Sequence, residues 1–155
     1  MHLYFLRHGE ADWPDWDRAN DERPLTKRGK KEMEKVADFL ELLDVAIDHM
    51  VTSPLPRARQ TAEIVADRFK WKLKKDALLE PGFDRAGLKR LLHKYDGAAI
   101  MLVGHEPDFT SVIHVLTGAA LKLSKAGLAL VEVDVAGMKG QLLWLFPPKI
   151  AKARR

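Results

Sequence analysis

Two histidines and several arginines occur in the sequence directly after short apolar runs. The segment Arg7-His8-Gly9 follows the first run, and Gly104-His105-Glu106 follows a later one. A third polar segment, Ser53 to Arg57, also follows such a run. A neutral imidazole is a competent nucleophile near pH 7 because its unperturbed pKa is about 6.5. Fixed guanidinium forks match the three equatorial oxygens of a phosphoryl group in transfer. These residue types therefore suit phosphoryl transfer, provided that the fold brings them together.

The elements that must position these residues can be predicted from hydrophobic periodicity. Apolar runs rich in Val, Ile, Leu and aromatics predict strands at His2 to Leu6, His49 to Thr52, Ala98 to Val103, Leu128 to Val135 and Leu142 to Phe146. Apolar residues at i, i+3, i+4 and i+7 predict helices that include Met33 to Leu40, Ala62 to Phe69, Leu88 to Tyr95 and Phe109 to Leu116. We expect Thr26 to cap the first helix and Gly118 to end the last.

Strands that alternate with helices are typical of a mostly parallel sheet covered on both faces. We therefore expect an α/β fold, a three-layer α/β/α sandwich, formed by one domain over residues 1–155. Such sheets collect their chemistry at the carboxyl ends of the strands. His8, Arg57 and His105 all follow predicted strands, so we expect them to converge in one cleft.

Composition narrows the function classes. The chain contains no cysteine, which excludes disulfides, zinc–thiolate sites and a cysteine nucleophile. No apolar run approaches the ~20 residues of a membrane span, and no small-residue cleavage site follows the first apolar stretch. We expect a soluble, unprocessed, cytoplasmic protein without a membrane partner.

The net charge is +4, with basic residues concentrated at Lys27 to Lys31, Lys70 to Lys75 and Lys149 to Arg155. These segments are either solvated faces or an electrostatic footprint for an anionic partner. No RNA-binding signature accompanies them, so no nucleic-acid partner is expected.

Four segments, in order and across nearly the whole chain, resemble motifs of the histidine phosphatase superfamily, which has the phosphoglycerate mutase-like fold. Leu6-Arg7-His8-Gly9-Glu10 resembles its N-terminal signature, and Thr52-Ser53-Pro54-Leu55-Pro56-Arg57-Ala58-Arg59-Gln60-Thr61-Ala62 resembles its second arginine motif. Val103-Gly104-His105-Glu106 resembles the segment that bears its second histidine. Arg23-Pro24-Leu25-Thr26, followed by Gly29, is similar to the start of the first helix in the short branch, the SixA-type phosphohistidine phosphatases.

The resemblance implies that His8 is the nucleophile and that Arg7, Arg57 and His105 form the phosphate pocket. Gly9 would let the backbone bend close to that pocket. A protonated His105 would add positive charge and a hydrogen-bond donor. Arg23 is either an extra substrate contact or a residue at the start of the helix that pairs with the acidic loop, and Arg59 is interpreted as a surface residue. No cofactor is implied.

The proton donor is the least well matched part of the pattern. Larger members carry an acid in a run of the form Leu-x-Glu-x-x-aromatic-Gly, and Leu78-Leu79-Glu80-Pro81-Gly82-Phe83-Asp84 fits except at its last position. Glu80 is therefore either a candidate general acid or a surface carboxylate.

The same residues allow two alternative functions, metal-dependent hydrolysis and phosphate binding without catalysis. Metal-dependent hydrolysis could use Glu10, Asp12, His105, Glu106 and Asp108, but no His-Glu-x-x-His spacing exists and an arginine-lined pocket would repel a cation. We expect no metal. A phosphate-binding module without catalysis could dispense with the nucleophile, yet both histidines are present.

Within enzymes, the substrate is either phosphohistidine on a protein or a small phosphate monoester. The resemblance implies that mutase members are longer, with insertions that close over a small substrate. Here only the short, acidic loop Glu10 to Arg23, with Trp13 and Trp16, lies between His8 and Thr26. An open site suits a bulky partner, which favours phosphohistidine on a protein.

Overall fold

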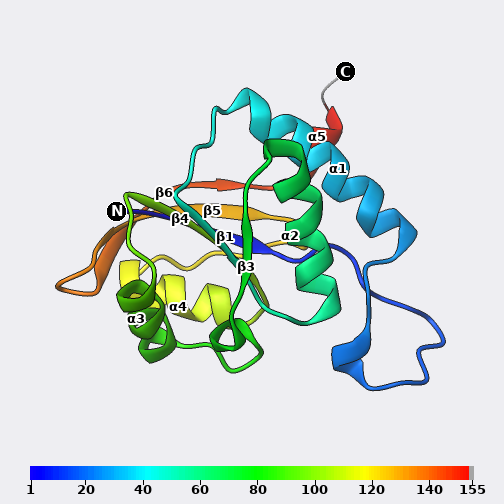
Figure 1. Cartoon of the computed structure of the whole chain (residues 1–155), viewed down its shortest axis with the longest axis horizontal. Helices are drawn as coiled ribbons and strands as arrows, with labels where there is room; N and C mark the ends of the chain where they lie inside the picture. The colour runs from blue at the N-terminus through cyan, green and yellow to red at the C-terminus, as the bar shows by residue number, and fades with distance from the viewer. Residues whose placement is uncertain (154–155) are drawn as a thin grey trace.

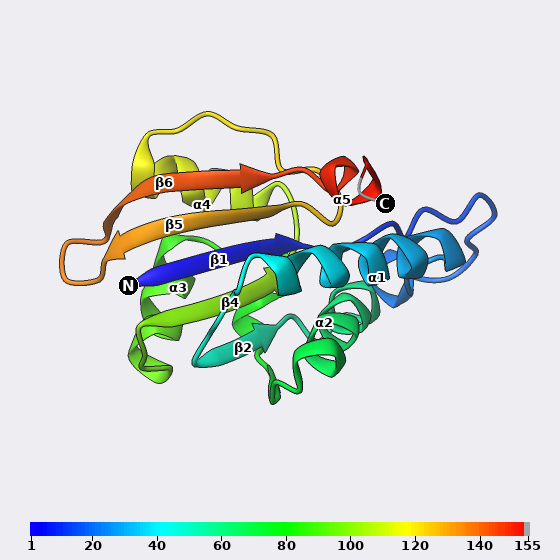
Figure 2. The ribbon, with the colours of Figure 1, turned by 90° about the horizontal axis from the view of Figure 1, so that it is seen from above.

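The computed structural model describes residues 1–153 of the chain. Within them, six strands form one sheet. In spatial order the strands are β3 (Leu73–Lys75), β2 (His49–Thr52), β4 (Ala99–Gly104), β1 (His2–Arg7), β5 (Leu128–Asp134) and β6 (Lys139–Phe146). The neighbours from β3 to β1 are parallel, whereas β5 is antiparallel to both β1 and β6 (Figure 2).

Helices cover both faces of the sheet, as Figure 1 shows. On one face lie α1 (Lys27–Leu42), α2 (Pro56–Phe69) and α5 (Lys149–Ala153), and on the other lie α3 (Arg85–Lys94) and α4 (Asp108–Thr117). Alternate strand residues serve the two cores, since Tyr4 and Leu6 belong to the first cluster and Leu3 and Phe5 to the second. The predicted three-layer α/β/α architecture is confirmed.

The predicted strands and helices are present, with boundaries shifted by a few residues. The Thr26 hydroxyl accepts a hydrogen bond from the Gly29 amide at 3.0 Å, so it caps α1 as predicted. Gly118 ends α4 with a φ of 77°, the left-handed conformation that favours glycine.

Several elements lie outside the sequence prediction. The sequence prediction omitted β3, the helix α5 and two short 3-10 helices, η1 (Asn20–Glu22) and η2 (Ala77–Leu79). The antiparallel hairpin of β5 and β6 was also not anticipated. Among the described residues, no helix is long and apolar enough to cross a membrane.

The register of the central strands determines which residues meet at the edge of the sheet. Arg7 pairs with Gly104, and Thr52 pairs with Val103. Because β2, β4 and β1 are parallel neighbours, the chain leaves all three at the same edge. The segments that begin at His8, Ser53 and His105 therefore start side by side.

Candidate active site

His8 and His105 meet at the carboxyl edge of the sheet, as the sequence predicts. Their ring centroids lie 5.4 Å apart. The His8 amide donates to the Gly104 carbonyl at 3.1 Å, so the backbone after β1 is tied directly to the residue before His105. Both histidines are buried, with exposed fractions of 8% and 3%.

The environment of His8 leaves one ring nitrogen available. Its Nδ1 lies 2.7 Å from the Gly9 carbonyl oxygen, which can only accept, so Nδ1 carries the proton and Nε2 keeps its lone pair. Burial is the main cause that lowers the pKa of His8 to about 3; His105 and the two arginines act in the same direction, and the hydrogen bond to Gly9 opposes them. The ring is therefore a neutral imidazole at pH 7, the form that a nucleophile requires.

His105 is held by Ser53 rather than by a carboxylate. Its Nε2 lies 2.8 Å from the Ser53 hydroxyl oxygen, and its Nδ1 is buried with no hydrogen-bond partner. Burial, followed by the charge of Arg57, lowers the pKa of His105 to about 4. The pocket thus holds a neutral His105 at pH 7, in contrast to the protonated form that the resemblance implies. A neutral ring still offers one N–H donor.

Arg7 and Arg57 approach the two histidines from different elements. Arg7 ends β1 and donates from Nη1 to the Leu123 carbonyl at 3.0 Å. Arg57 lies in the first turn of α2, where its side chain is buried against η1. It donates from Nη1 to the Asn20 carbonyl at 3.3 Å, and its Nη2 lies 3.8 Å from the Asp21 carboxylate.

Three buried side-chain nitrogens lack a hydrogen-bond partner within residues 1–153: Arg7 Nε, Arg57 Nε and His105 Nδ1. An unsatisfied buried donor is costly, and native proteins rarely keep one without a reason. All three belong to residues of the predicted phosphate pocket. The arrangement therefore presents unused hydrogen-bonding capacity next to the neutral imidazole of His8.

Thr61 links two parts of the site, a role that the sequence analysis did not assign. Its hydroxyl accepts from the Gly9 amide at 3.0 Å and donates to the Arg57 carbonyl at 2.8 Å. Arg57 and Thr61 are four residues apart, one helical turn on α2, and this spacing is the signal that could have identified Thr61. Gly9 itself packs closely, since a Cβ there would lie 3.2 Å from the Met33 side chain.

The acidic loop between β1 and α1 is held in place by Arg23. The guanidinium donates to the carbonyls of Ala11, at 2.9 Å, and Asn20, at 3.2 Å, and to the Asp12 carboxylate. The sequence allows Arg23 to be either a substrate contact or a partner of the acidic loop. In the structure it bonds to the loop. Both tryptophans also bond within the loop segment, Trp13 to the Pro24 carbonyl and Trp16 to the Ala19 carbonyl.

The side chains of Glu80 and Arg59 are neither hydrogen-bonded nor ion-paired to this cluster in the described residues. Within the described residues, the Glu80 carboxylate has no hydrogen bond or ion pair with any pocket residue, and the residue follows η2. Arg59 forms an ion pair with Glu63, one turn further along α2, at 3.0 Å. The role of Glu80 as a general acid stays a prediction.

Two of the acidic residues considered as metal ligands, Glu106 and Asp108, accept hydrogen bonds from protein groups. The Glu106 carboxylate accepts from the Thr110 amide at 2.8 Å and from the Thr110 hydroxyl, and Asp108 accepts from the Gly82 amide at 2.8 Å. Throughout the part of the chain that the structure describes, no group of three or more His, Asp or Glu side chains could hold a metal ion.

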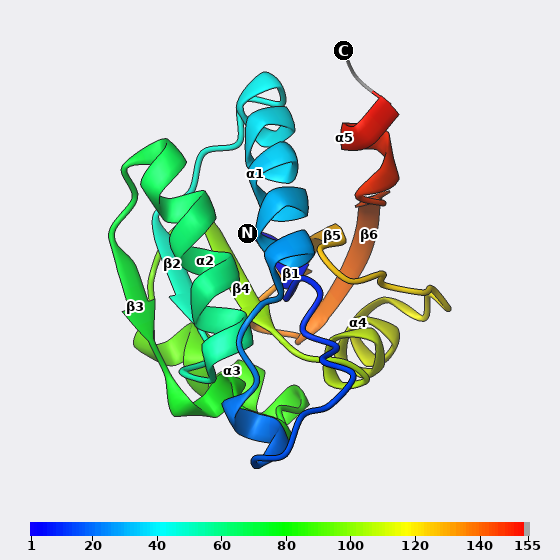
Figure 3. The ribbon, with the colours of Figure 1, turned by 90° about the vertical axis from the view of Figure 1, so that its right-hand side faces the viewer.

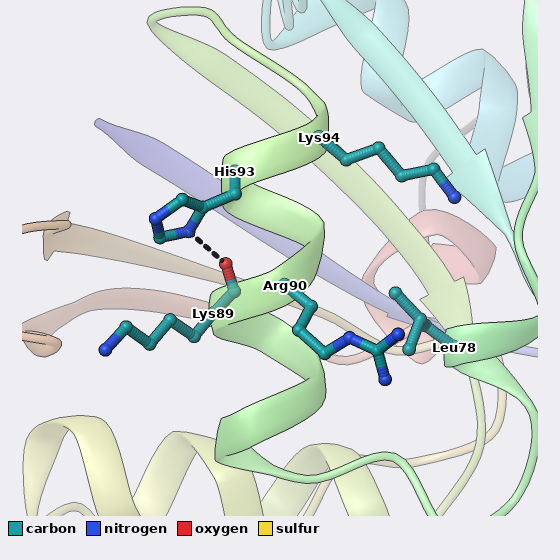
Figure 4. A pocket seen from close by; sticks show the side chains of 5 residues that line it. All are labelled: Leu78, Lys89, Arg90, His93 and Lys94. Atoms are coloured by element: carbon teal, nitrogen blue, oxygen red, sulfur yellow. Dashed lines mark hydrogen bonds between the residues drawn. The ribbon is translucent and has the colours of Figure 1, made fainter.

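A separate hollow of about 560 Å³ lies on α3, outside the histidine cluster. Figure 4 shows that Lys89 and Lys94 extend to opposite sides of the helix, while Arg90 runs toward Leu78. The His93 ring bonds back to the Lys89 carbonyl at 2.8 Å. These cations do not converge on one point, so the hollow does not form a second phosphate pocket.

Comparison with known proteins identifies the family and the fold of this chain. The sequence model of the family described as the histidine phosphatase superfamily (branch 1) matches residues 3–81. An uncharacterized protein from Picosynechococcus sp. is 38% identical over 141 residues, which cover 83% of this chain and 82% of that protein.

Two further relatives have named activities. A probable phosphoglycerate mutase, GpmB, from Cronobacter sakazakii is 30% identical over 118 residues, covering 70% of this chain but only 52% of that protein, so this chain spans about half its length. A solved structure of the protein histidine phosphatase SixA complexed with tungstate superposes with a TM-score of 0.84 at 26% identity, covering 97% of this chain and 99% of that one.

Proposed function

This chain belongs to the histidine phosphatase superfamily, and on that premise we propose that it is a phosphatase which acts through a phosphohistidine on His8 and removes phosphate from phosphohistidine on a partner protein. The family and the SixA-like structure support phosphatase activity. The choice of nucleophile and of substrate is our inference from the site.

One observation carries the proposal. The three unpartnered buried nitrogens, on Arg7, Arg57 and His105, belong to side chains gathered around a histidine that is neutral at pH 7. A phosphoryl group supplies several oxygen acceptors at once, and fixed donors aimed at developing negative charge stabilise the transition state without reorganisation. The same donors would have no such use in a purely structural cluster.

The geometry supports a two-step transfer. The lone pair of His8 Nε2 attacks phosphorus, a bond from Nε2 to phosphorus forms, and the bond to the substrate nitrogen breaks. The protonated imidazole of the substrate leaves as a neutral ring, so no strong external acid is required. A water oxygen then attacks the same phosphorus, the electron pair returns to Nε2, and inorganic phosphate leaves with the oxygen of that water. The Gly9 carbonyl keeps the His8 tautomer fixed throughout.

The substrate class is inferred from the hydrogen bonds of the pocket and from the solved structure that this chain resembles. Among the described residues, no hydrogen bond joins Glu80 or another carboxylate to the His8 ring, whereas an alkyl ester would need a positioned proton donor. The structure of similar fold named as a protein histidine phosphatase supports the same choice. The alternative, a phosphatase for small phosphate monoesters, is supported by the relationship to a probable phosphoglycerate mutase.

The proposal is tested by turnover of purified protein on a panel of phosphohistidine proteins and small phosphate esters. We expect kcat/KM to be greater for the phosphohistidine proteins, and we expect His8→Ala to abolish both activities. Faster turnover of small esters with no action on phosphohistidine would favour the alternative. Tight phosphate binding without any turnover would instead indicate a non-catalytic binding module.

A further inference from the structure

A charged groove of about 370 Å³ lies beside Arg7. Six of the side chains that line it carry charge: Arg7, Glu10, Arg28, Glu32, Lys122 and Lys125. Arg28 and Glu32 come from the first turns of α1, whereas the two lysines come from the segment between α4 and β5. Figure 3 shows the chain that follows β1 passing between the start of α1 and this yellow segment.

The groove continues along α1 into a second hollow of about 580 Å³, which shares Arg28 and Glu32 and adds Lys27, Lys31 and Lys35. We call the charged lining of the two hollows the basic strip. It contains seven cations and two carboxylates, a net charge of +5, whereas the whole chain carries only +4. The chain outside the strip is therefore close to neutral, and the positive charge of the protein is concentrated here.

Within the described residues, most of the strip cations form no salt bridge. Within residues 1–153, Lys125 pairs with Asp12, but no salt bridge involves Lys122 or the four strip cations on α1, which are Lys27, Arg28, Lys31 and Lys35. Those four are exposed, while Met33 and Val36 turn the other side of α1 into the core. From Lys27 to Lys35 the helix rises about 12 Å, the length of about four residues of extended peptide.

The position of the strip relates it to the phosphoryl site. Arg7 lines the groove and also adjoins His8, and its Nη1 is bonded to the Leu123 carbonyl in the segment that carries the two lysines. On the Arg57 side, by contrast, the site is bordered by both a cation, Arg23, and a carboxylate, Asp21. A polypeptide whose phosphorylated side chain reaches His8 therefore meets an excess of positive charge on the Arg7 side of the pocket and mixed charge on the Arg57 side.

We propose that the basic strip binds an acidic segment adjacent to the phosphorylated residue of the substrate protein. This inference rests on the proposed function and specifies the partner: a protein with Asp or Glu residues flanking its phosphohistidine on the side that faces Arg7. Complementary charge of this kind contributes mainly to encounter and to orientation rather than to the chemical step. The strip should therefore affect KM and not kcat.

The test compares two charge reversals of equal size. Arg28→Glu with Lys31→Glu alters the strip, and Lys89→Glu with Arg90→Glu alters the basic face of α3 (Figure 4). Both variants and the wild type are assayed with a phosphohistidine peptide that has acidic flanks, with the same peptide bearing Gln and Asn flanks, and with p-nitrophenyl phosphate.

We expect the strip variant to raise KM for the acidic peptide by about tenfold, with kcat unchanged and with unchanged KM for the other two substrates. The wild-type preference for acidic flanks should also fade as salt rises from about 0.05 M to about 0.5 M. The α3 variant should behave like the wild type. Equal KM values for strip variant and wild type, or an equal effect of the α3 variant, would overturn the proposal.

Direct binding separates this inference from the proposed function. Fluorescence anisotropy of a labelled, unphosphorylated acidic peptide measures the strip without any turnover, and we expect its affinity to fall about tenfold in the strip variant. If no phosphohistidine peptide is hydrolysed but the strip variant still loses affinity for the acidic peptide, the result supports peptide binding by the strip and contradicts the proposed substrate. If instead an RNA oligonucleotide or phosphatidylserine vesicles bind through Arg28 and Lys31 and the acidic peptide does not, the strip serves another partner and the inference is wrong.

Discussion

The imidazole rings of His8 and His105 lie with their centroids 5.4 Å apart, buried at the edge of the sheet and within the electrostatic influence of Arg57. Neither ring is hydrogen-bonded to a carboxylate in the described structure, since His8 bonds to the Gly9 carbonyl and His105 to the Ser53 hydroxyl. A positive charge on either ring would be poorly solvated and close to other cations. The pocket therefore keeps both rings neutral until an anion arrives.

This relationship predicts the titration of the two rings. Because burial lowers the pKa of His8 to about 3 and that of His105 to about 4, both rings should stay unprotonated as the pH falls from about 8 to about 5. NMR of protein with isotope-labelled histidine measures this, with His8→Gln and His105→Gln used for assignment. A midpoint near 6.5 for either ring would show that burial does not control these residues.

Arg57 is predicted to act through its planar fork. Lysine would offer a single point charge where the guanidinium offers two parallel donors, so Arg57→Lys should lower kcat by roughly a hundredfold or more. The matched control is Arg59→Lys on the same helix, since Arg59 pairs with Glu63 at the surface. Steady-state kinetics that find similar rates for both variants would remove Arg57 from the phosphate pocket.

Thr61 is predicted to hold the backbone of the site. Thr61→Val keeps the shape of the side chain but leaves the Gly9 amide buried without its acceptor, which should lower the free energy of unfolding by about 1–3 kcal/mol. Urea denaturation measures this change. Thr61→Ser retains the hydroxyl and serves as the control, and a Val variant as stable as the Ser variant would mean that the Gly9 bond contributes little.

Glu80 distinguishes the two substrate classes. Glu80→Gln removes a transferable proton while keeping the shape, so it should barely slow the hydrolysis of phosphohistidine. If Glu80 reaches alkyl phosphates as their general acid, their hydrolysis should slow by about 10²–10⁴-fold. Parallel kcat measurements on the two substrates test the contrast. Fast wild-type turnover of alkyl phosphates that collapses in this variant, without action on phosphohistidine proteins, would favour the small-ester function.

Much of the site could be predicted because its residues follow strands of a parallel sheet. The carboxyl ends of neighbouring parallel strands share an edge, so the apolar runs before His8, Ser53 and His105 were sufficient to predict their convergence. The caps at Thr26 and Gly118 were likewise predictable, since they depend only on local side-chain and backbone chemistry.

The remaining features depend on contacts between distant segments. The strand β3 has only three residues, two of them lysines, so it lacks the apolar periodicity that identifies a strand. The hydrogen bond from Arg57 to Asn20 of η1 joins residues 37 positions apart in the sequence. The hydrogen bond between Ser53 and His105 joins residues 52 positions apart. The neutral state of His105 follows from its burial, which sequence spacing does not reveal.

The central claim is that His8 carries the phosphoryl group on Nε2, and it is tested most directly by trapping that intermediate. Phosphoramidates survive base better than acid, so wild-type protein mixed with substrate is quenched rapidly in alkali, digested and analysed by mass spectrometry and ³¹P NMR. We predict phosphate on His8 alone, attached to Nε2 because the Gly9 carbonyl engages Nδ1, with none in His8→Ala. Phosphate on another residue, or turnover by His8→Ala near the wild-type rate, would contradict the account.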